Sequence, residues 1–184
     1  MGYDYNDMLK SAENICRRFP FAEFFSIGES VMEKKIYCLR IGKGKRKVFI
    51  NGAHHGLEYI SSAFIMKFIE NYASAVSCET DICGHSAKKL YESVSLFAVP
   101  MVNPDGINLV QNGYDSTQNP ENVKNMPANQ YGARGWKATV NGVDLNNNFD
   151  CLWRPKGTAP SFGGYAGPYA ASEPETRAMQ KLID

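Results

Sequence analysis

The alternation of strand-like and helix-like segments constrains the fold of this chain more than any other feature of its sequence. Segment Val94–Val99 is almost entirely apolar, as expected for a strand in the middle of a sheet. Two more β-rich runs precede it, Ile36–Ile41 and Val48–Asn51. Amphipathic helical patterns lie before and between these runs. The order of the segments therefore predicts an α/β fold in a single domain.

Three helices are predicted from periodicity and capping signals. Apolar residues recur at helical spacing from Met8 to Cys16, and this first helix should end near Pro20. In the second, Tyr59–Tyr72, apolar side chains crowd most faces, which predicts a helix packed on a sheet with its Met and Phe side chains in the core. The third begins at Ser172, where Ser-Glu-Pro-Glu supplies an N-cap, an early proline and a glutamate at the capping-box position.

This last helix reaches Asp184 without a Gly or Asn stop signal, so we expect residues 1–184 to be the N-terminal part of a longer domain. Two polar segments separate the predicted elements. Gly42–Lys47 carries four cations, and a solvated hairpin turn between the two strands explains it better than a basic binding patch does. Gln111–Gly135 lacks apolar periodicity, which is typical of a functional or disordered connection.

Composition excludes several classes of partner. Lys and Arg total 20 and Asp and Glu total 19, so the net charge of +1 predicts no general attraction to nucleic acid or to a membrane surface. No apolar run is long enough to span a membrane, and the first residues lack a signal-peptide pattern, so we expect a cytoplasmic protein.

Five scattered cysteines indicate reduced thiols. Cys78, Cys83 and His85 lie close together in the sequence, but no second pair of zinc-ligand residues accompanies them. An ordinary loop is therefore favoured over a metal site there.

The strongest local signal for chemistry is the segment from Asn51 to Glu58, which lies where a strand hands over to a helix. His55 and Glu58 are three residues apart, so their side chains can converge on one point. An imidazole and a carboxylate are two of the three protein ligands in a His2Glu catalytic zinc site. On this pair alone, a capping Glu58 and a hydrogen-bonded core His55 explain the sequence better than a metal site does. We assign His54 no ligand role, because its side chain should point elsewhere.

Four motifs follow in order downstream, at residues 102–106, 134–137, 141–149 and 165–176, and they read Val-Asn-Pro-Asp-Gly, Arg-Gly-Trp-Lys, Asn-Gly-Val-Asp-Leu-Asn-Asn-Asn-Phe and Tyr-Ala-Gly-Pro-Tyr-Ala-Ala-Ser-Glu-Pro-Glu-Thr. Together with the segment at His55 they resemble the zinc carboxypeptidase family, the relatives of carboxypeptidase A. The resemblance extends over nearly the whole chain. It implies a mixed, twisted eight-stranded sheet flanked by helices on both faces, and one zinc ion bound by a His, a Glu and a second His, with a glutamate as general base.

The resemblance also assigns roles by motif position. His55 and Glu58 match the first two zinc ligands. Lys137 stands directly after Trp136, where the family has an arginine that stabilises the oxyanion; a lysine keeps the charge but loses the planar fork. Arg134 matches an arginine of the substrate cleft, with a solvated loop cation as the alternative. The third zinc ligand, the general base and a tyrosine that closes over the substrate are expected beyond residue 184.

One departure from the family bears on specificity. Members that trim a free C-terminus carry Asn-Arg where this chain has Asn146-Asn147, and that arginine grips the terminal carboxylate. Loss of the arginine is similar to the bacterial branch that hydrolyses γ-D-glutamyl-diaminopimelate bonds in cell-wall peptides. The expected substrate is therefore a peptide or a murein peptide, bound by Arg134, Asn146 and Asn147.

Two alternatives remain open at this point. One is a zinc N-acyl-amino-acid deacylase of the aspartoacylase type, which shares His-Gly-x-Glu and Asp-Leu-Asn. The other is a non-catalytic peptide-binding remnant. With only His55 and Glu58 as ligands, the 184-residue polypeptide should be inactive alone and should bind zinc weakly or not at all. An unpaired sheet edge should also make it unstable or self-associating.

Overall fold

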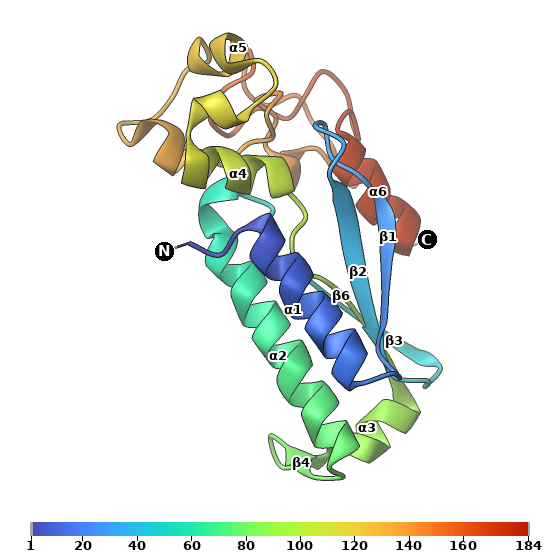
Figure 1. The fold of residues 1–184 in the computed structure, drawn as a ribbon. Helices are drawn as coiled ribbons and strands as arrows, with labels where there is room; N and C mark the ends of the chain where they lie inside the picture. The colour runs from blue at the N-terminus through green and yellow to red at the C-terminus, as the bar shows by residue number, and fades with distance from the viewer. Residues whose placement is uncertain (1, 184) are drawn as a thin grey trace.

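A mixed four-stranded sheet forms the centre of the chain in a computed structural model that describes residues 2–183 (Figure 1). Its strands lie in the order β1-β2-β6-β3, with bounds Glu23–Glu29, Lys35–Ile41, Val94–Val99 and Arg46–Asn51. The pairs β1–β2 and β2–β6 are antiparallel, whereas β3 runs parallel to β6. The predicted α/β class and the mixed sheet are confirmed. The resemblance implies an eight-stranded sheet, and the central sheet described within residues 2–183 has four strands.

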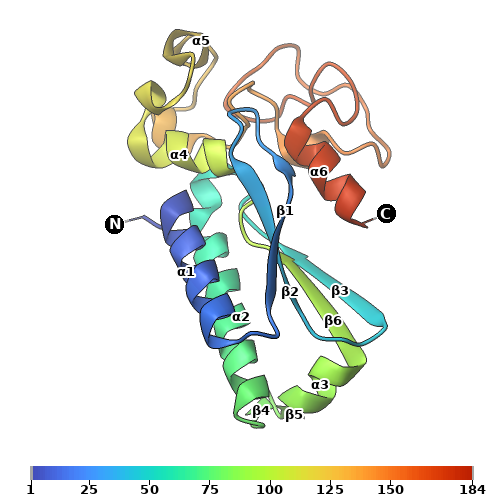
Figure 2. The same ribbon diagram turned by 45° about the vertical axis from the view of Figure 1, so that its right-hand side comes forward.

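Helices cover both faces of the sheet, as predicted. Helices α1 (Tyr5–Arg18) and α2 (Tyr59–Ser77) lie side by side on one face, and α6 (Pro174–Ile183) lies on the other (Figures 1 and 2). Successive side chains of β2 point to opposite faces of the sheet, so this strand contacts the helices on both faces. Leu39 and Ile41 pack into the core below α1 and α2, whereas Ile36 and Cys38 pack with the apolar side chains of α6.

The first two predicted helices form, but one detail of α2 is wrong. Asp4 caps α1 through a capping box with Asp7. Helix α2 begins at Tyr59 as predicted and buries Ile65, Met66 and Ile69. We expected the Met and Phe side chains of this helix in the core, but Phe64 is 75% exposed and Phe68 is 38% exposed. Helix α2 packs on the sheet through one side only, so apolar side chains on its other side stay in solvent.

The predicted hairpin at Gly42–Lys47 is also wrong, because β6 lies between β2 and β3. The segment crosses the beginning of β6 instead of turning back on itself. Lys43 N donates to Tyr91 O at 2.9 Å, and Ser95 Oγ donates to Gly44 O at 2.7 Å. The inserted strand comes more than forty residues later in the sequence. Turn signals are local, so they cannot predict such a long-range pairing.

The predicted central strand Val94–Val99 is β6, with the same bounds. Sequence analysis missed strand β1 and several short elements: β4 (Asp81–Ile82), β5 (His85–Ser86), α3 (Ala87–Ser93) and α4 (Pro104–Asn112). The polar segment Gln111–Gly135 holds three short helices: η2 (Tyr114–Ser116), α5 (Pro120–Lys124) and η3 (Gly132–Gly135). None of the helices described within residues 2–183 is long and apolar enough to cross a bilayer.

The helix predicted at Ser172 is α6, but Glu175 does not serve as its capping-box residue. Its carboxylate is fully buried, and Oε1 accepts a hydrogen bond from Val31 N at 3.0 Å. Burial, first of all, raises the pKa of Glu175 to about 8, and the nearby carboxylates of Glu173 and Asp105 act in the same direction. Asp105 is buried as well and accepts a hydrogen bond from Met32 N at 2.8 Å. Two buried carboxyl groups thus hold the turn between β1 and β2.

Candidate functional site

The site lies where the parallel strands β3 and β6 end at the same edge of the sheet, a position at which α/β folds place ligands. Gly52 N donates to Val99 O and Val102 N donates to Gly52 O, both at 3.1 Å. The two segments that follow β3 and β6 therefore leave the sheet side by side. The loop after β3 carries His55, and the loop after β6 carries Asn103. The geometry of the sheet therefore brings two of the sequence motifs into contact.

Asn103 ties three loops together at this edge. It is fully buried and accepts a hydrogen bond from Gly106 N through its side chain, which caps α4. Its Nδ2 donates to His54 O at 3.2 Å and to Ala138 O at 3.0 Å. The loop that carries His55 is thereby fixed to the loop that follows Trp136.

The helical turn η1 (Gly56–Glu58) requires glycine at its first position. A Cβ atom on Gly56 would lie 2.3 Å from Gly106 O, so no side chain fits between this turn and α4. Gly56 N donates to Lys137 O at 3.2 Å. The tight turn places the Glu58 side chain on the same side as the imidazole of His55.

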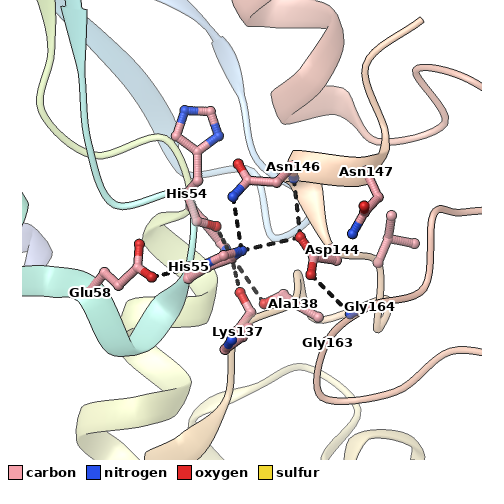
Figure 3. A network of polar contacts seen from close by, with 12 residues as sticks. His54, His55, Glu58, Lys137, Ala138, Asp144, Asn146, Asn147, Gly163 and Gly164 are labelled. Atoms are coloured by element: carbon pink, nitrogen blue, oxygen red, sulfur yellow. Dashed lines mark hydrogen bonds and ion pairs between the residues drawn. The ribbon is translucent and has the colours of Figure 1, made fainter. Parts of the chain in front are cut away.

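The predicted convergence of His55 and Glu58 is present (Figure 3). His55 Nδ1 lies 2.9 Å from Glu58 Oε1, and His55 Nε2 lies 3.1 Å from Asp144 Oδ1. The hydrogen bond to Asp144 is the main cause that raises the pKa of His55 above its ordinary value; burial opposes it, and the hydrogen bond to Glu58 adds to it. The imidazole is thus held between two carboxylates, one buried and one half-exposed.

Asp144 is the residue of this site that sequence analysis missed. Burial acts to raise its pKa, but hydrogen bonds from His55, Gly164 N and Asn146 N outweigh burial and hold the pKa below its ordinary value. An ionised Asp144 accepts only, so His55 Nε2 carries a proton and its Nδ1 is turned toward Glu58. The motif Val-Asp-Leu-Asn contained the signal, but its partner His55 is 89 positions away in the sequence.

Asn146 and Asn147 lie on η4 (Leu145–Asn147), directly after Asp144. Asn146 Nδ2 is 3.3 Å from His55 Nε2, so Asn146 belongs to the network around the imidazole. Asn147 N donates to Asp144 O at 2.9 Å, and Figure 3 shows its side chain beside Asp144.

Lys137 and Arg134 lie in different surroundings. Lys137 N donates to Phe162 O at 2.8 Å, and the Lys137 side chain runs along Gly163 next to the network. Arg134 lies on η3 and lines a separate hollow with Leu57, Tyr59 and Gln111. The structure therefore brings His55, Glu58, Asn146, Asn147 and Lys137 to one place, and it places Arg134 to the side of them.

His54, to which we assigned no ligand role, points away from the pair. Its Nε2 lies 2.6 Å from Asn51 Oδ1, and Figure 3 shows its ring directed away from Glu58. Burial, mainly, lowers the pKa of His54 to about 4.

The donor set fits part of a zinc site. An imidazole nitrogen and a carboxylate oxygen converge within 2.9 Å, and a carboxylate on the far ring nitrogen is the hydrogen-bond partner that zinc-bound imidazoles ordinarily have. Residues 2–183 hold no group of three or more His, Cys, Asp or Glu side chains arranged for a metal ion. His55 and Glu58 could therefore hold zinc together with a donor from outside these residues.

Comparisons with known proteins identify the family of the chain. Residues 8–184 match the family described as zinc carboxypeptidase. The chain is 35% identical over 185 residues to gamma-D-glutamyl-L-diamino acid endopeptidase 1 of Lysinibacillus sphaericus, covering 98% of this chain and 47% of that protein. It is also 35% identical over 188 residues to the uncharacterised protein YqgT of Bacillus subtilis, covering 98% of this chain and 50% of that protein.

The fold has a close match among solved structures. Bovine thrombin-activatable fibrinolysis inhibitor, in its complex with tick carboxypeptidase inhibitor, superposes with a TM-score of 0.70 at 24% identity. That match covers all of this chain and 56% of the solved chain, and the chain spans about half the length of the two bacterial relatives. With a family match over residues 8–184 and a sheet of the same architecture, the chain belongs to the zinc carboxypeptidase family.

Proposed function

We propose that the protein containing this chain is a zinc-dependent peptidase that hydrolyses the γ-D-glutamyl-diaminopimelate amide bond of cell-wall peptides with a zinc-activated water. The observation that carries the proposal is the convergence of His55 Nδ1 and Glu58 Oε1, with Asp144 on the far side of the imidazole. When bound, zinc supplies Lewis acidity toward a water molecule and the scissile carbonyl.

The chain's own residues have three tasks in this proposal. His55 and Glu58 would hold the metal, while Asp144 keeps His55 Nε2 protonated and the ring in place. Lys137, held beside the network through Phe162 O and Gly163, supplies positive charge for the oxyanion that develops during hydrolysis. Arg134, Asn146 and Asn147 bind the substrate. The third zinc ligand and the general base come from outside residues 2–183.

The choice of substrate rests on Asn147 and on a relative. An amide hydrogen-bonds a carboxylate without bringing charge, so Asn147 is poorly suited to the task of the family's arginine in gripping an ordinary C-terminus. The Lysinibacillus sphaericus relative is named as a γ-D-glutamyl-L-diamino acid endopeptidase. The family match favours a peptidase over an N-acyl-amino-acid deacylase.

Steady-state kinetics on the full-length protein with zinc tests the proposal. We expect kcat/KM to be at least about tenfold higher for a γ-D-glutamyl-diaminopimelate peptide than for a plain peptide with a free C-terminus. His55→Ala should abolish both reactions, whereas Lys45→Ala, an exposed lysine of the β2–β3 connection, should change neither.

Each contrary result identifies a different error. Comparable kcat/KM on the two peptides would contradict the proposed substrate. Hydrolysis of N-acyl amino acids alone would identify a deacylase. Peptide binding without hydrolysis by the zinc-loaded protein would identify a non-catalytic member of the family.

A further inference from the structure

Glu173, the residue directly before α6, is a buried carboxylate that none of the tasks proposed above uses. Its side chain accepts three hydrogen bonds: Oε2 from Thr139 Oγ1 at 2.9 Å and from Asn141 Nδ2 at 3.0 Å, and Oε1 from Ser172 Oγ at 3.1 Å. The residue is 3% exposed, and within residues 2–183 it forms no ion pair with a lysine or arginine. Burial of a carboxylate is unfavourable unless hydrogen bonds satisfy it, so neutral donors alone satisfy this one.

Two of these donors belong to the turn that comes directly before Asp144. Thr139 N donates to Val143 O at 2.9 Å, and Val143 N donates to Thr139 Oγ1 at 3.4 Å. The Thr139 hydroxyl therefore closes the turn and binds Glu173 at the same time. The chain continues from Val143 into Asp144, the partner of His55.

A second contact ties Glu173 to the residue that follows η4. Glu173 N donates to Asn148 Oδ1 at 3.1 Å. Asn148 is fully buried, and its Nδ2 donates in turn to Ala166 O at 2.8 Å. Asp144 lies between Thr139 and Asn148 in the sequence, so Glu173 holds the segment on both sides of it.

The position of this segment matters because Asp144 uses both of its carboxylate oxygens. Oδ1 lies 3.1 Å from His55 Nε2, and Oδ2 accepts from Gly164 N at 2.9 Å. A displacement of the segment that carries Asp144 would lengthen at least one of these hydrogen bonds. The orientation of the His55 ring would then lose its support.

We propose that Glu173 is a positioning residue of the zinc site: through Thr139 and Asn148 it fixes the place of Asp144, and through Asp144 the orientation of His55. The inference rests on the zinc site of the proposed function and adds a carboxylate that touches neither metal nor substrate. If Glu173 acts in this way, its loss is felt by the metal only while Asp144 is present to be positioned.

A double-mutant cycle on the full-length protein tests this dependence, with zinc affinity measured by competition with a chelator. Glu173→Ala should weaken zinc binding about tenfold in the wild-type background but less than about twofold in the Asp144→Asn background. Glu173→Gln should restore the affinity, because a glutamine oxygen can accept from Thr139 and Asn141.

Two further variants separate positioning from stability. Glu175→Ala is the matched control: Glu175 lies two residues later, is equally buried and anchors the β1–β2 turn instead. It should lower the free energy of unfolding without changing zinc affinity. Asn141→Ala, at an exposed position, removes a single donor to Glu173 and covers the case in which Glu173→Ala does not fold. It should weaken zinc binding about threefold, again only while Asp144 is present.

Contrary outcomes distinguish this inference from the proposed function. If Glu173→Ala and Asn141→Ala weaken zinc binding equally with and without Asp144, or not at all, Glu173 does not act through Asp144 and the peptidase assignment stands. A loss of affinity in Glu175→Ala as large as in Glu173→Ala would indicate general destabilisation and would overturn the positioning role. If the wild-type protein binds zinc but hydrolyses no peptide, the proposed function fails, whereas the cycle of zinc affinities still decides the role of Glu173.

Discussion

Nε2 of His55 donates a hydrogen bond to Asp144 Oδ1 at 3.1 Å. This contact decides which of the two ring nitrogens keeps a free lone pair. Because Asp144 is held ionised by several donors, the proton of the neutral ring stays on Nε2. The lone pair of Nδ1 is then directed to the side on which Glu58 Oε1 lies, 2.9 Å away. The orientation needed by a metal ligand is therefore present in the chain itself.

We predict that Asp144→Asn weakens zinc binding by the full-length protein about 10- to 100-fold, because the ring loses its negatively charged partner. Competition with a chelator of known affinity measures the effect. Asp150→Asn is the matched control, because Asp150 is exposed and forms no ion pair within residues 2–183. Equal affinities for the two variants would show that Asp144 plays no part in holding the metal ligand.

A second prediction concerns zinc binding by the 184-residue polypeptide alone. Two converging donors are one fewer than catalytic zinc ordinarily receives from protein, so we expect binding weaker than about 1 μM. Isothermal titration measures it. Submicromolar affinity that His55→Ala abolishes would contradict this prediction and would reveal a third ligand within these residues.

Sequence alone could predict those contacts of the site whose residues are close together in the chain. His55 and Glu58 are three residues apart and were found as a pair, whereas Asp144 reaches His55 across 89 positions and was not. The hydrogen bond from Lys156 Nζ to Asn147 Oδ1, 2.9 Å long, could not be predicted for a related reason: it depends on the course of an irregular loop rather than on periodicity or a motif. Sequence indicated which residue types to expect, and the fold determined their partners.

The same distinction holds for the elements of the fold. Strand Val94–Val99 and the helices that begin at Tyr5, Tyr59 and Pro174 carry their own apolar patterns and were predicted. The Gly42–Lys47 connection was misread, since its route depends on β6 entering between two earlier strands. Glu175 fits a capping box in sequence, but the turn at Val31 offers its carboxyl group a buried N–H instead.

The pKa of the buried Glu175 yields a prediction about stability. Burial raises this pKa from an ordinary value of 4.5 to about 8, so the native state keeps a proton that the unfolded state has lost. The free energy of unfolding should therefore fall as the pH rises from about 5 to about 9. The contribution of this one group is at most about 5 kcal/mol.

Glu175→Gln tests this dependence because glutamine keeps an oxygen that can accept from Val31 N but cannot ionise. Urea denaturation at pH 5, 7 and 9 should show a smaller loss of stability for this variant than for the wild type. Glu13→Gln, at an exposed position of α1, is the control and should follow the wild type. Parallel pH profiles for Glu175→Gln and the wild type would mean that Glu175 is ionised in the native state.

The free edge of β3 yields the last prediction. Within residues 2–183, β3 pairs with β6 on one side only, and Val48 in its middle is 39% exposed. Apolar grooves lie along both faces of the strand, one lined by Phe68, Tyr72 and Leu96 and the other by Phe97 and Leu182. An unpaired strand between two apolar surfaces is a template for a second chain. We therefore expect the 184-residue polypeptide, made alone, to self-associate through β3.

Light scattering should give a mass well above 20.5 kDa for this polypeptide, and Val48→Lys should shift the mass toward that of the monomer. A charge in the middle of the edge opposes pairing, because a second strand would bury it. Leu152→Lys is the matched control, because Leu152 is apolar and 88% exposed but lies in a loop far along the chain from β3. A wild-type polypeptide of confirmed mass that stays monomeric and melts cooperatively at about 45–65 °C would contradict the prediction. Such a result would mean that the β3 edge is satisfied by solvent and that its apolar surroundings are too small to drive association.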